Sequence, residues 1–371
     1  MDAKPFYHDA VSDPYAYAAH WKERQRQPVV AHFCSYTPEE VVWAAGALPL
    51  RIFGQSTRIM AADTHLQSYA CSLVRGALED ALAGRLDFAD GVVFPHTCDA
   101  IQRLSDIWRL NVPHGFHLDA VLPVKLDTPS AQAYMRDIVT RFARDLEARL
   151  AVSISDASLR AAIRLYNRLR QGLRDLYRLR SENPAALTGS VLQAIARAAM
   201  IMDREAFVNG LEQLVADLDG RGAAPSGRKR LILSGGLCSM PDIYSLIETA
   251  GGDVVGDDLC TGSRSFDGVI GDEPTPLAAI ADRYRERMVC PAKHMDLTRR
   301  GDHLVALVKK HRAQGVVFVL LKFCDPHAFD YPYMKKMLDA AGIPSLLFEI
   351  EDQQIGAGQV RTRCEAFIEM L

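Results

Sequence analysis

The sequence predicts an α/β protein with two lobes, each built on a doubly wound parallel sheet, and a helical region between them. Short apolar runs alternate with helical patterns in residues 29–108 and again in residues 231–371, and this alternation is typical of parallel sheets. Residues 128–219 are helical, charged and without a convincing strand. At 371 residues the chain is too long for one usual hydrophobic core. The predicted segments are an N-terminal lobe at 1–127, a helical region at 128–220 and a C-terminal lobe at 221–371.

In the N-terminal lobe, the predicted strand at residues 29–33 leads directly to Cys34. The next helix is predicted to start with a capping box, in which Thr37 is the cap, Pro38 follows it and Glu40 lies three residues after it. Residues 68–75 are predicted to open another helix that continues to Gly84, because its apolar residues keep helical spacing, and Cys71 is expected in or near its first turn. The remaining predicted elements of this lobe are strands at 48–53 and 88–94 and a helix at 100–108.

In the C-terminal lobe, the clearest element is a strand at residues 315–323. It is a continuous apolar run with β-branched and aromatic residues, as expected of a strand that is covered on both faces. Pro326 ends the strand, and Asp330 is the predicted cap of the next helix. The other predicted strands are 231–234, 253–256 and 345–350, and the predicted helices are 242–250, 277–288, 302–314, 331–341 and 359–371.

Composition excludes several classes of protein. A net charge of −3 gives no electrostatic footprint for nucleic acid. The longest apolar runs, such as residues 316–321, are far shorter than a membrane span. The N-terminus has no apolar core of a signal peptide, so we expect a cytoplasmic protein. In that compartment, eight cysteines are not expected to form a disulfide framework.

The cysteines are the residues that point to chemistry. Cys98, Cys260 and Cys324 each follow a predicted strand, and open α/β sheets bind ligands beyond the carboxyl ends of their strands. Cys34 and Cys71 lie near helix starts, where the helix dipole favours a thiolate. No two cysteines form a C-x-x-C pair, so zinc-ribbon spacing is absent. Scattered cysteines of this kind are compatible with an iron–sulfur cluster, but also with ordinary buried thiols, as expected for Cys364 in the last helix.

Other polar residues lie close to these cysteines. His96 and His327 are candidate proton donors, although a histidine satisfied by a backbone partner is an equally good interpretation. The turn of Ser234, Gly235 and Gly236 follows a strand and precedes a helix, so its amides could bind a phosphate of coenzyme A. No complete P-loop, nucleophile elbow or His-Glu-x-x-His pair is present, and we do not expect the chain to hydrolyse ATP itself.

Taken together, seven stretches resemble the 2-hydroxyacyl-CoA dehydratase and benzoyl-CoA reductase family. They follow one another along most of the chain: residues 33–40 (FCSYTPEE), 44–49 (AAGALP), 68–71 (SYAC), 90–99 (DGVVFPHTCD), 257–262 (DDLCTG), 322–326 (KFCDP) and 358–363 (GQVRTR). The resemblance implies two Rossmann-like lobes with a [4Fe–4S] cluster between them, held by Cys71, Cys98 and Cys324. It also implies a related subunit or second copy, an ATP-hydrolysing iron–sulfur activator protein and a CoA-thioester substrate.

Three functions follow from the resemblance. The first is the iron–sulfur subunit of an oxidoreductase like benzoyl-CoA reductase, or of a lyase like 2-hydroxyacyl-CoA dehydratase, working through a radical anion. The second is a homodimeric reductase of small molecules with a double-cubane [8Fe–9S] cluster. That cluster needs six cysteines, and Cys34, Cys260 and Cys290 could complete the set, with Cys238 competing with Cys290. The third is a non-catalytic electron-relay subunit. The acyl group of the substrate is not readable from the sequence.

Overall fold

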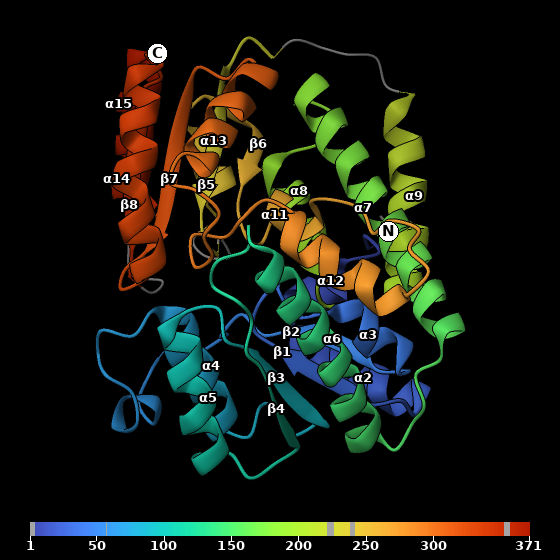
Figure 1. Cartoon of the computed structure of the whole chain (residues 1–371). Helices are drawn as coiled ribbons and strands as arrows, with labels where there is room; N and C mark the ends of the chain where they lie inside the picture. Colours follow the sequence, from blue (N-terminus) through green and yellow to red (C-terminus); the bar gives the residue numbers. More distant parts are fainter. Residues whose placement is uncertain (1–3, 57, 221–225, 238–241, 352–356) are drawn as a thin grey trace. The chain divides into compact units, whose positions relative to one another are not determined.

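The computed structural model describes residues 4–56, 58–220, 226–237, 242–351 and 357–371. The chain forms two compact units, and each contains one four-stranded sheet in which all strands are parallel (Figure 1). The predicted α/β class with two parallel sheets is therefore confirmed. Unit 1 comprises Met1–Arg170, Ala198–Gly210 and Gly268–Met295, and unit 2 comprises Gln171–Arg197, Leu211–Asp267 and Asp296–Leu371.

The sheet of unit 1 has the strand order β2-β1-β3-β4. Its strands are β1 (Val29–His32), β2 (Leu48–Arg51), β3 (Gly91–Pro95) and β4 (Phe116–Ala120). Every residue of β1 and β3 is buried, as their apolar sequences predict for central strands. Sequence patterns missed β4, because this edge strand carries His117 and Asp119 and is partly exposed.

Helices surround this sheet and extend unit 1 beyond residue 127. They are α1 (His8–Ser12), α2 (Pro14–Gln25), α3 (Glu39–Ala44), α4 (Ser72–Leu82), α5 (Asp99–Asn111), α6 (Pro129–Leu150) and α12 (Pro276–Glu286), with a 3-10 turn at Ala62–Thr64. α6 and α12 pack on each other, and their apolar residues Met135, Phe142 and Ile280 share one buried core with Val30 and Val93 of the sheet. This shared core explains why unit 1 includes segments far apart in sequence.

The compact units are divided differently from the three predicted segments. The region predicted as helical at 128–220 indeed forms helices, which continue after α6 as α7 (Asp156–Glu182), α8 (Gly189–Ala198) and α9 (Arg204–Asp219). These helices do not form a unit of their own, since each of the last three contributes residues to both units. Helices of this segment also contact each other, since Leu211 of α9 lies against Gly172 of α7 and Arg178 of α7 pairs with Asp219 of α9.

Unit 2 repeats the topology of unit 1, with the strand order β6-β5-β7-β8. Its strands are β5 (Lys229–Gly235), β6 (Gly252–Asp258), β7 (Gly315–Leu321) and β8 (Ser345–Ile350), and its own helices are α10 (Ile243–Thr249), α11 (Ser263–Phe266), α13 (Arg299–Lys310), α14 (Asp325–Ala340) and α15 (Ala357–Met370). Side chains alternate across β7: Val317 and Val319 pack in one core, and Val316 and Phe318 pack in another. The predicted covering of this strand on both faces is confirmed.

Two predicted helix starts are wrong. α14 begins at Asp325 instead of residue 331, because Pro326 fits the first turn, where its missing N–H is not needed. Asp330 therefore lies inside the helix, where it accepts a hydrogen bond from Arg300. α3 begins at Glu39 with Pro38 at the N-cap and no side-chain cap.

Glu40, predicted to belong to the capping box of α3, forms a buried ion pair instead. Its carboxylate is fully buried and pairs with the guanidinium of Arg170, which is also buried. The hydroxyl of Tyr284 donates a second hydrogen bond to Glu40 at 3.0 Å. A carboxylate and a guanidinium removed from water in this way depend on each other, because either one alone is an uncompensated buried charge. The pair joins α3 to α7 and α12 within unit 1.

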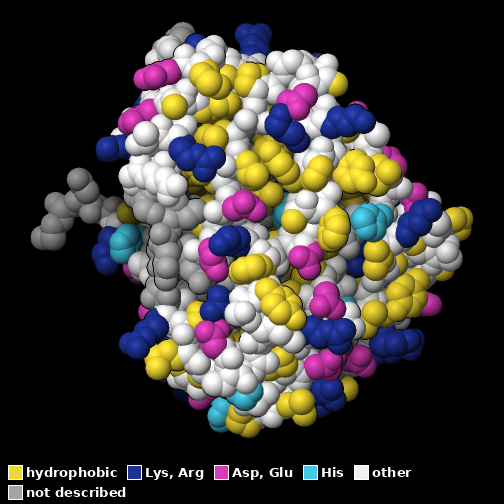
Figure 2. All heavy atoms as spheres, turned by 90° about the vertical axis from the view of Figure 1, so that its left-hand side faces the viewer, with side chains coloured by type: hydrophobic (Ala, Val, Ile, Leu, Met, Phe, Trp, Pro, Cys, Tyr) yellow, Lys and Arg dark blue, Asp and Glu magenta, His cyan; other side chains and the backbone are white. Residues whose placement is uncertain are grey.

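No described helix is long and apolar enough to cross a membrane. Figure 2 shows hydrophobic, basic and acidic side chains interspersed over the face that it presents.

We predict that Glu40→Ala lowers the free energy of unfolding by about 3–5 kcal/mol, since it leaves Arg170 as a buried charge without its carboxylate. Urea denaturation of wild type and variant measures the loss. Asp106→Ala is the matched control, because Asp106 pairs with Arg109 on the exposed surface of α5. The control is expected to change stability by no more than about 1 kcal/mol. Equal losses in both variants would contradict a special role for the buried pair.

Candidate functional site

The strand order of each unit defines a topological switch point at the carboxyl end of its sheet. In unit 1 the chain leaves the neighbouring strands β1 and β3 in opposite directions, which makes the space beyond them a topological switch point. Cys34 follows the end of β1 by two residues, and Cys98 follows the end of β3 by three. In unit 2 the equivalent strands are β5 and β7, and Cys324 follows the end of β7 by three residues. Cys98 and Cys324 thus hold equivalent positions in their units.

Three of the predicted cluster ligands also share a position on helices. Cys71, Cys98 and Cys324 are the N-cap residues of α4, α5 and α14, respectively. The first backbone N–H groups of a helix have no intrahelical acceptor, and the helix dipole places partial positive charge there. Such a position favours the thiolate, which is the form of cysteine that binds metal. The predicted placement of these residues at strand ends and helix starts is confirmed.

Four thiols gather in unit 1. Burial raises the pKa of the Cys98 thiol to about 12, the backbone N–H of Ile101 acts against this, and Cys71, Cys34 and Cys290 raise it further. Each of these thiols is therefore close enough to Cys98 for its negative form to repel a thiolate there. The cluster-free chain keeps Cys98 protonated. Only positive charge brought to this group allows several thiolates to coexist.

Two buried cations that sequence reasoning missed lie beside the same thiols. Burial lowers the pKa of Arg287, but Tyr36, Tyr284, Cys34 and Cys290 outweigh that effect and hold it above its ordinary value. The Arg287 guanidinium lies 3.9 Å from the ring centre of Tyr36. Lys293 is the second cation, and it interacts with Cys34, Cys290 and Cys98. The only signal in the sequence was the spacing of three residues between Cys290 and Lys293, which carries no recognised motif.

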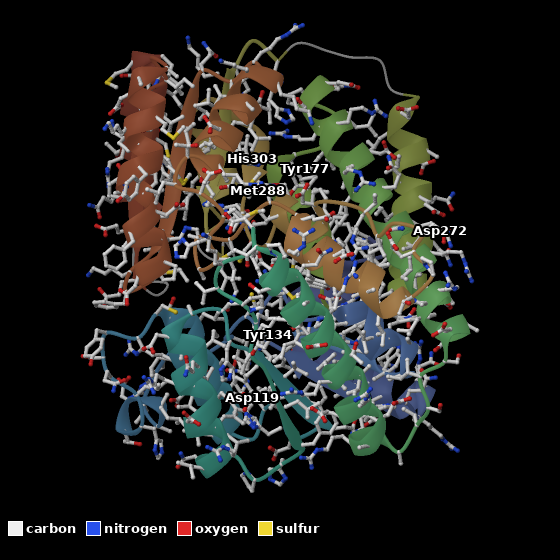
Figure 3. All side chains as sticks on the ribbon, in the orientation of Figure 1. Asp119, Tyr134, Tyr177, Asp272, Met288 and His303 are labelled. Carbon is white, nitrogen blue, oxygen red and sulfur yellow. The ribbon has the colours of Figure 1, made fainter. Side chains whose placement is uncertain are left out.

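His96 belongs to a hydrogen-bonded network at the carboxyl ends of β3 and β4. Its Nε2 lies 2.8 Å from Oδ1 of Asp119, which is labelled on β4 in Figure 3. The same Asp119 oxygen accepts a hydrogen bond from the buried hydroxyl of Ser105, whose oxygen lies 2.8 Å from Nε2 of His117. The network orients the His96 ring two residues before Cys98. Sequence reasoning found His96 but not its partners, because β4 was not predicted.

In unit 2, Cys260 and Cys324 follow the strands on either side of β5. The backbone N–H of Cys260 donates to the carbonyl of Gly236 at 3.2 Å, which ties the end of β6 to the turn after β5. Phe323, directly before Cys324, has a φ of 63°. A non-glycine residue in this left-handed region costs about 1–2 kcal/mol. Cys364, a residue of α15, lies buried in the core, as predicted, and Cys238 lies outside the described residues.

The turn after β5 is surrounded by buried charge. Ser234 donates its hydroxyl to Asp258 at 3.2 Å, and Arg264 donates to the carbonyl of Gly235. Burial raises the pKa of Asp258, but Arg264 and Arg300 outweigh it and lower that pKa to about 2. Burial, together with the same two arginines, holds the pKa of His327 well below its ordinary value. The His327 ring is therefore neutral at pH 7, with one N–H to donate.

The structure sorts the predicted site residues into two groups. Unit 1 brings together Cys34, Cys71, Cys98 and Cys290, with His96 in the adjacent network. Unit 2 holds Cys260, Cys324, His327 and the stretch of Ser234, Gly235 and Gly236. The prediction that this stretch is a turn is wrong for Ser234 and Gly235, because both belong to β5 and pair with β7, so only Gly236 follows the strand. Among the described residues, no three Cys, His, Asp or Glu side chains are placed to bind one metal ion together.

Fold and site define a class: an α/β protein with two lobes of one topology, in which cysteines cap helices beside the switch points. Comparison with known proteins gives the family. The profile described as 2-hydroxyglutaryl-CoA dehydratase, D-component, matches residues 34–371, and the chain belongs to this family. The resemblance predicted from sequence motifs is thus confirmed.

Similar proteins cover nearly the whole chain. The (R)-phenyllactyl-CoA dehydratase beta subunit of Clostridium sporogenes is 28% identical over 365 residues, which is 98% of this chain and 97% of that protein. The beta subunit of lactoyl-CoA dehydratase from Anaerotignum propionicum is 27% identical, covering 98% and 97%. A benzoyl-CoA reductase subunit of Thauera aromatica is 27% identical, covering 95% and 94%. All three relatives are subunits of enzymes, and two are named beta subunits.

We predict that Asp119→Asn lowers the free energy of unfolding by about 1–2 kcal/mol, because Ser105 and His96 lose a charged acceptor. Urea denaturation of the cluster-free protein measures this loss. Asp106→Asn on the exposed side of α5 serves as the control, with an expected change within about 0.5 kcal/mol. If Asp119→Asn is as stable as the control, the network does not hold His96 in place.

Proposed function

We propose that this chain is the iron–sulfur subunit of an enzyme that acts on CoA thioesters through low-potential radical-anion chemistry. The enzyme resembles benzoyl-CoA reductase, an oxidoreductase, or a 2-hydroxyacyl-CoA dehydratase, a lyase. The observation that carries the proposal is the gathering of Cys34, Cys71, Cys98 and Cys290 in unit 1. This gathering occurs in a chain whose relatives are named as subunits of both kinds of enzyme.

Cys71, Cys98 and Cys324 are the proposed ligands of a [4Fe–4S] cluster. Thiolates are the usual ligands of such clusters, and the N-cap position of each of these cysteines favours the thiolate. Each thiolate binds a different iron atom, so the ligands do not have to meet at one point. When bound, the cluster supplies a low-potential electron and a Lewis-acidic iron for the thioester oxygen.

The chain's own residues have roles around that group. His96, held by Asp119, is the proposed proton donor. His327 is neutral at pH 7, so its proposed catalytic role is to donate a hydrogen bond from its ring N–H to the substrate. The backbone amides at Ser234, Gly235 and Gly236 are the proposed contact for a phosphate of coenzyme A, with the nearby Arg264 adding positive charge.

The proposed partners are a protein subunit and an electron donor. The subunit is a related chain or a second copy of this one, and the naming of two relatives as beta subunits supports a multi-subunit enzyme. The donor is an ATP-hydrolysing iron–sulfur activator protein.

A second candidate function is a homodimeric reductase with a double-cubane [8Fe–9S] cluster. One observation favours it: Cys34 and Cys290 lie with Cys71 and Cys98 in unit 1, so this unit offers more thiols than a single cubane needs from it. With Cys260 and Cys324 of unit 2 the described cysteines suitable for binding number six, as such a cluster requires. A third candidate, an electron-relay subunit, requires only that a partner holds the substrate.

We predict that anaerobic reconstitution gives about four irons and four sulfides per chain for a single cubane. Cys324→Ala abolishes this iron binding, because it removes a proposed ligand, whereas Cys364→Ala leaves it intact, because Cys364 is a core residue. Iron and sulfide analysis of the purified variants measures the outcome. A result of about eight irons per chain contradicts the single cubane and supports the double-cubane cluster. Normal iron content in Cys324→Ala contradicts the ligand assignment, and no iron in wild type contradicts the proposed function.

We further predict that benzoyl-CoA or a 2-hydroxyacyl-CoA changes the electron paramagnetic resonance spectrum of the reduced, cluster-loaded protein, while free coenzyme A does not. The physical reason is contact between the thioester oxygen and an iron that lacks a cysteine ligand. An unchanged spectrum with every thioester tested supports the electron-relay function instead.

A further inference from the structure

Lys293 is a lysine placed almost fully inside unit 1. Its exposed fraction is 1%, although lysine is rarely buried to this degree. The Nζ atom donates to the carbonyl oxygens of Leu122 at 3.2 Å and of His96 at 3.4 Å. Two neighbouring segments therefore orient the ammonium, one after β3 and the other after β4. These two hydrogen bonds fix the position of the ammonium inside unit 1.

The charge of Lys293 has no carboxylate to balance it. Among the residues that the structure describes, no Asp or Glu lies within ion-pair distance of Nζ. Carbonyl oxygens satisfy hydrogen bonds but carry no net charge, so the lobe holds a buried cation without a counter-ion of the usual kind. Burying such a charge is costly unless an anion accompanies it. The positive charge of Lys293 is therefore not matched by a carboxylate in its surroundings.

Lys293 lies beside the segments that carry the thiols of unit 1. Its backbone N–H donates to the carbonyl of Cys290 at 2.8 Å, and its Nζ donates to the carbonyl of His96, two residues before Cys98. Cys34, Cys290 and Cys98 all interact with its ammonium. Burial lowers the pKa of Lys293 to about 8, and these three cysteines act in the opposite direction. Arg287, which also interacts with Cys34 and Cys290, adds a second buried cation beside the thiol group.

We propose that Lys293 is a positioning residue whose ammonium balances the negative charge of the cluster whose proposed ligands include Cys71 and Cys98 of unit 1. This inference rests on the proposed function, since it requires a cluster at these cysteines. Thiolate ligands make such a cluster anionic, and each added electron makes it more so. A fixed cation nearby stabilises the cluster and favours its reduced form over its oxidised form. Lys293 does not touch the substrate in this role.

The test compares Lys293→Met with Lys293→Arg, which keeps the charge, and with Lys336→Met, an exposed lysine of α14, as control. Three measurements are made: urea denaturation without the cluster, the rate of iron release to a chelator, and the midpoint potential from redox titration followed by electron paramagnetic resonance. We expect Lys293→Met to be at least as stable as wild type without the cluster, because an unbalanced buried charge is removed. With the cluster, we expect about tenfold faster iron release and a more negative midpoint potential.

Lys293→Arg is expected to restore most of both properties, and Lys336→Met to leave them unchanged. If Lys293→Met folds poorly, Lys293→Gln replaces it, since its amide can still donate to the two carbonyls without a charge. Wild-type potential and iron release in the neutral variant overturn the inference while leaving the proposed function intact. Failure of the wild-type protein to bind iron overturns the proposed function as well.

Discussion

The parallel order of the strands is the constraint on which this molecule depends. Parallel strands joined by helices present all their carboxyl ends, and the N-termini of the following helices, at one edge of the sheet. A cysteine placed a few residues after a strand therefore arrives at a helix N-terminus beside the switch point. Cys98 follows β3 and Cys324 follows β7, and each is the N-cap residue of the next helix. The two cysteines hold equivalent positions because the two units have the same topology. The position of a cysteine relative to its strand thus determines which edge of the sheet it reaches.

Buried charge then decides what the thiols of unit 1 can do. Burial and the neighbouring thiols raise the pKa of Cys98, so without a metal this cysteine stays protonated. The lobe nevertheless carries Arg287 and Lys293 next to this group, and the hydrogen bonds of Lys293 go to carbonyls. By contrast, Glu40 and Arg170 in the same lobe balance each other's charge. In the proposed cluster, the thiolates carry negative charge and the Lys293 ammonium carries positive charge. Each would therefore balance the other inside unit 1.

Much of the architecture was predictable from the sequence, because apolar runs and turn residues report local structure. The central strands β1, β3 and β7 were found in this way, and so were the cysteines that follow them. Long-range packing was not predictable: β4 is polar and partly exposed, and Pro326 obscured the start of α14. Glu40 was assigned to a helix cap because its partner Arg170 is distant in sequence. Lys293 has no motif, so only the fold reveals that it lies beside the segments that carry the thiols.

The most direct test of this account is an anaerobic crystal structure of the reconstituted protein, with anomalous difference maps measured at the iron edge. The account predicts iron peaks bonded to the Sγ atoms of Cys71, Cys98 and Cys324, with the Lys293 ammonium facing the bound thiolates. Iron bound elsewhere in the chain, or a structure in which Cys98 and Cys324 ligate no metal, would contradict it.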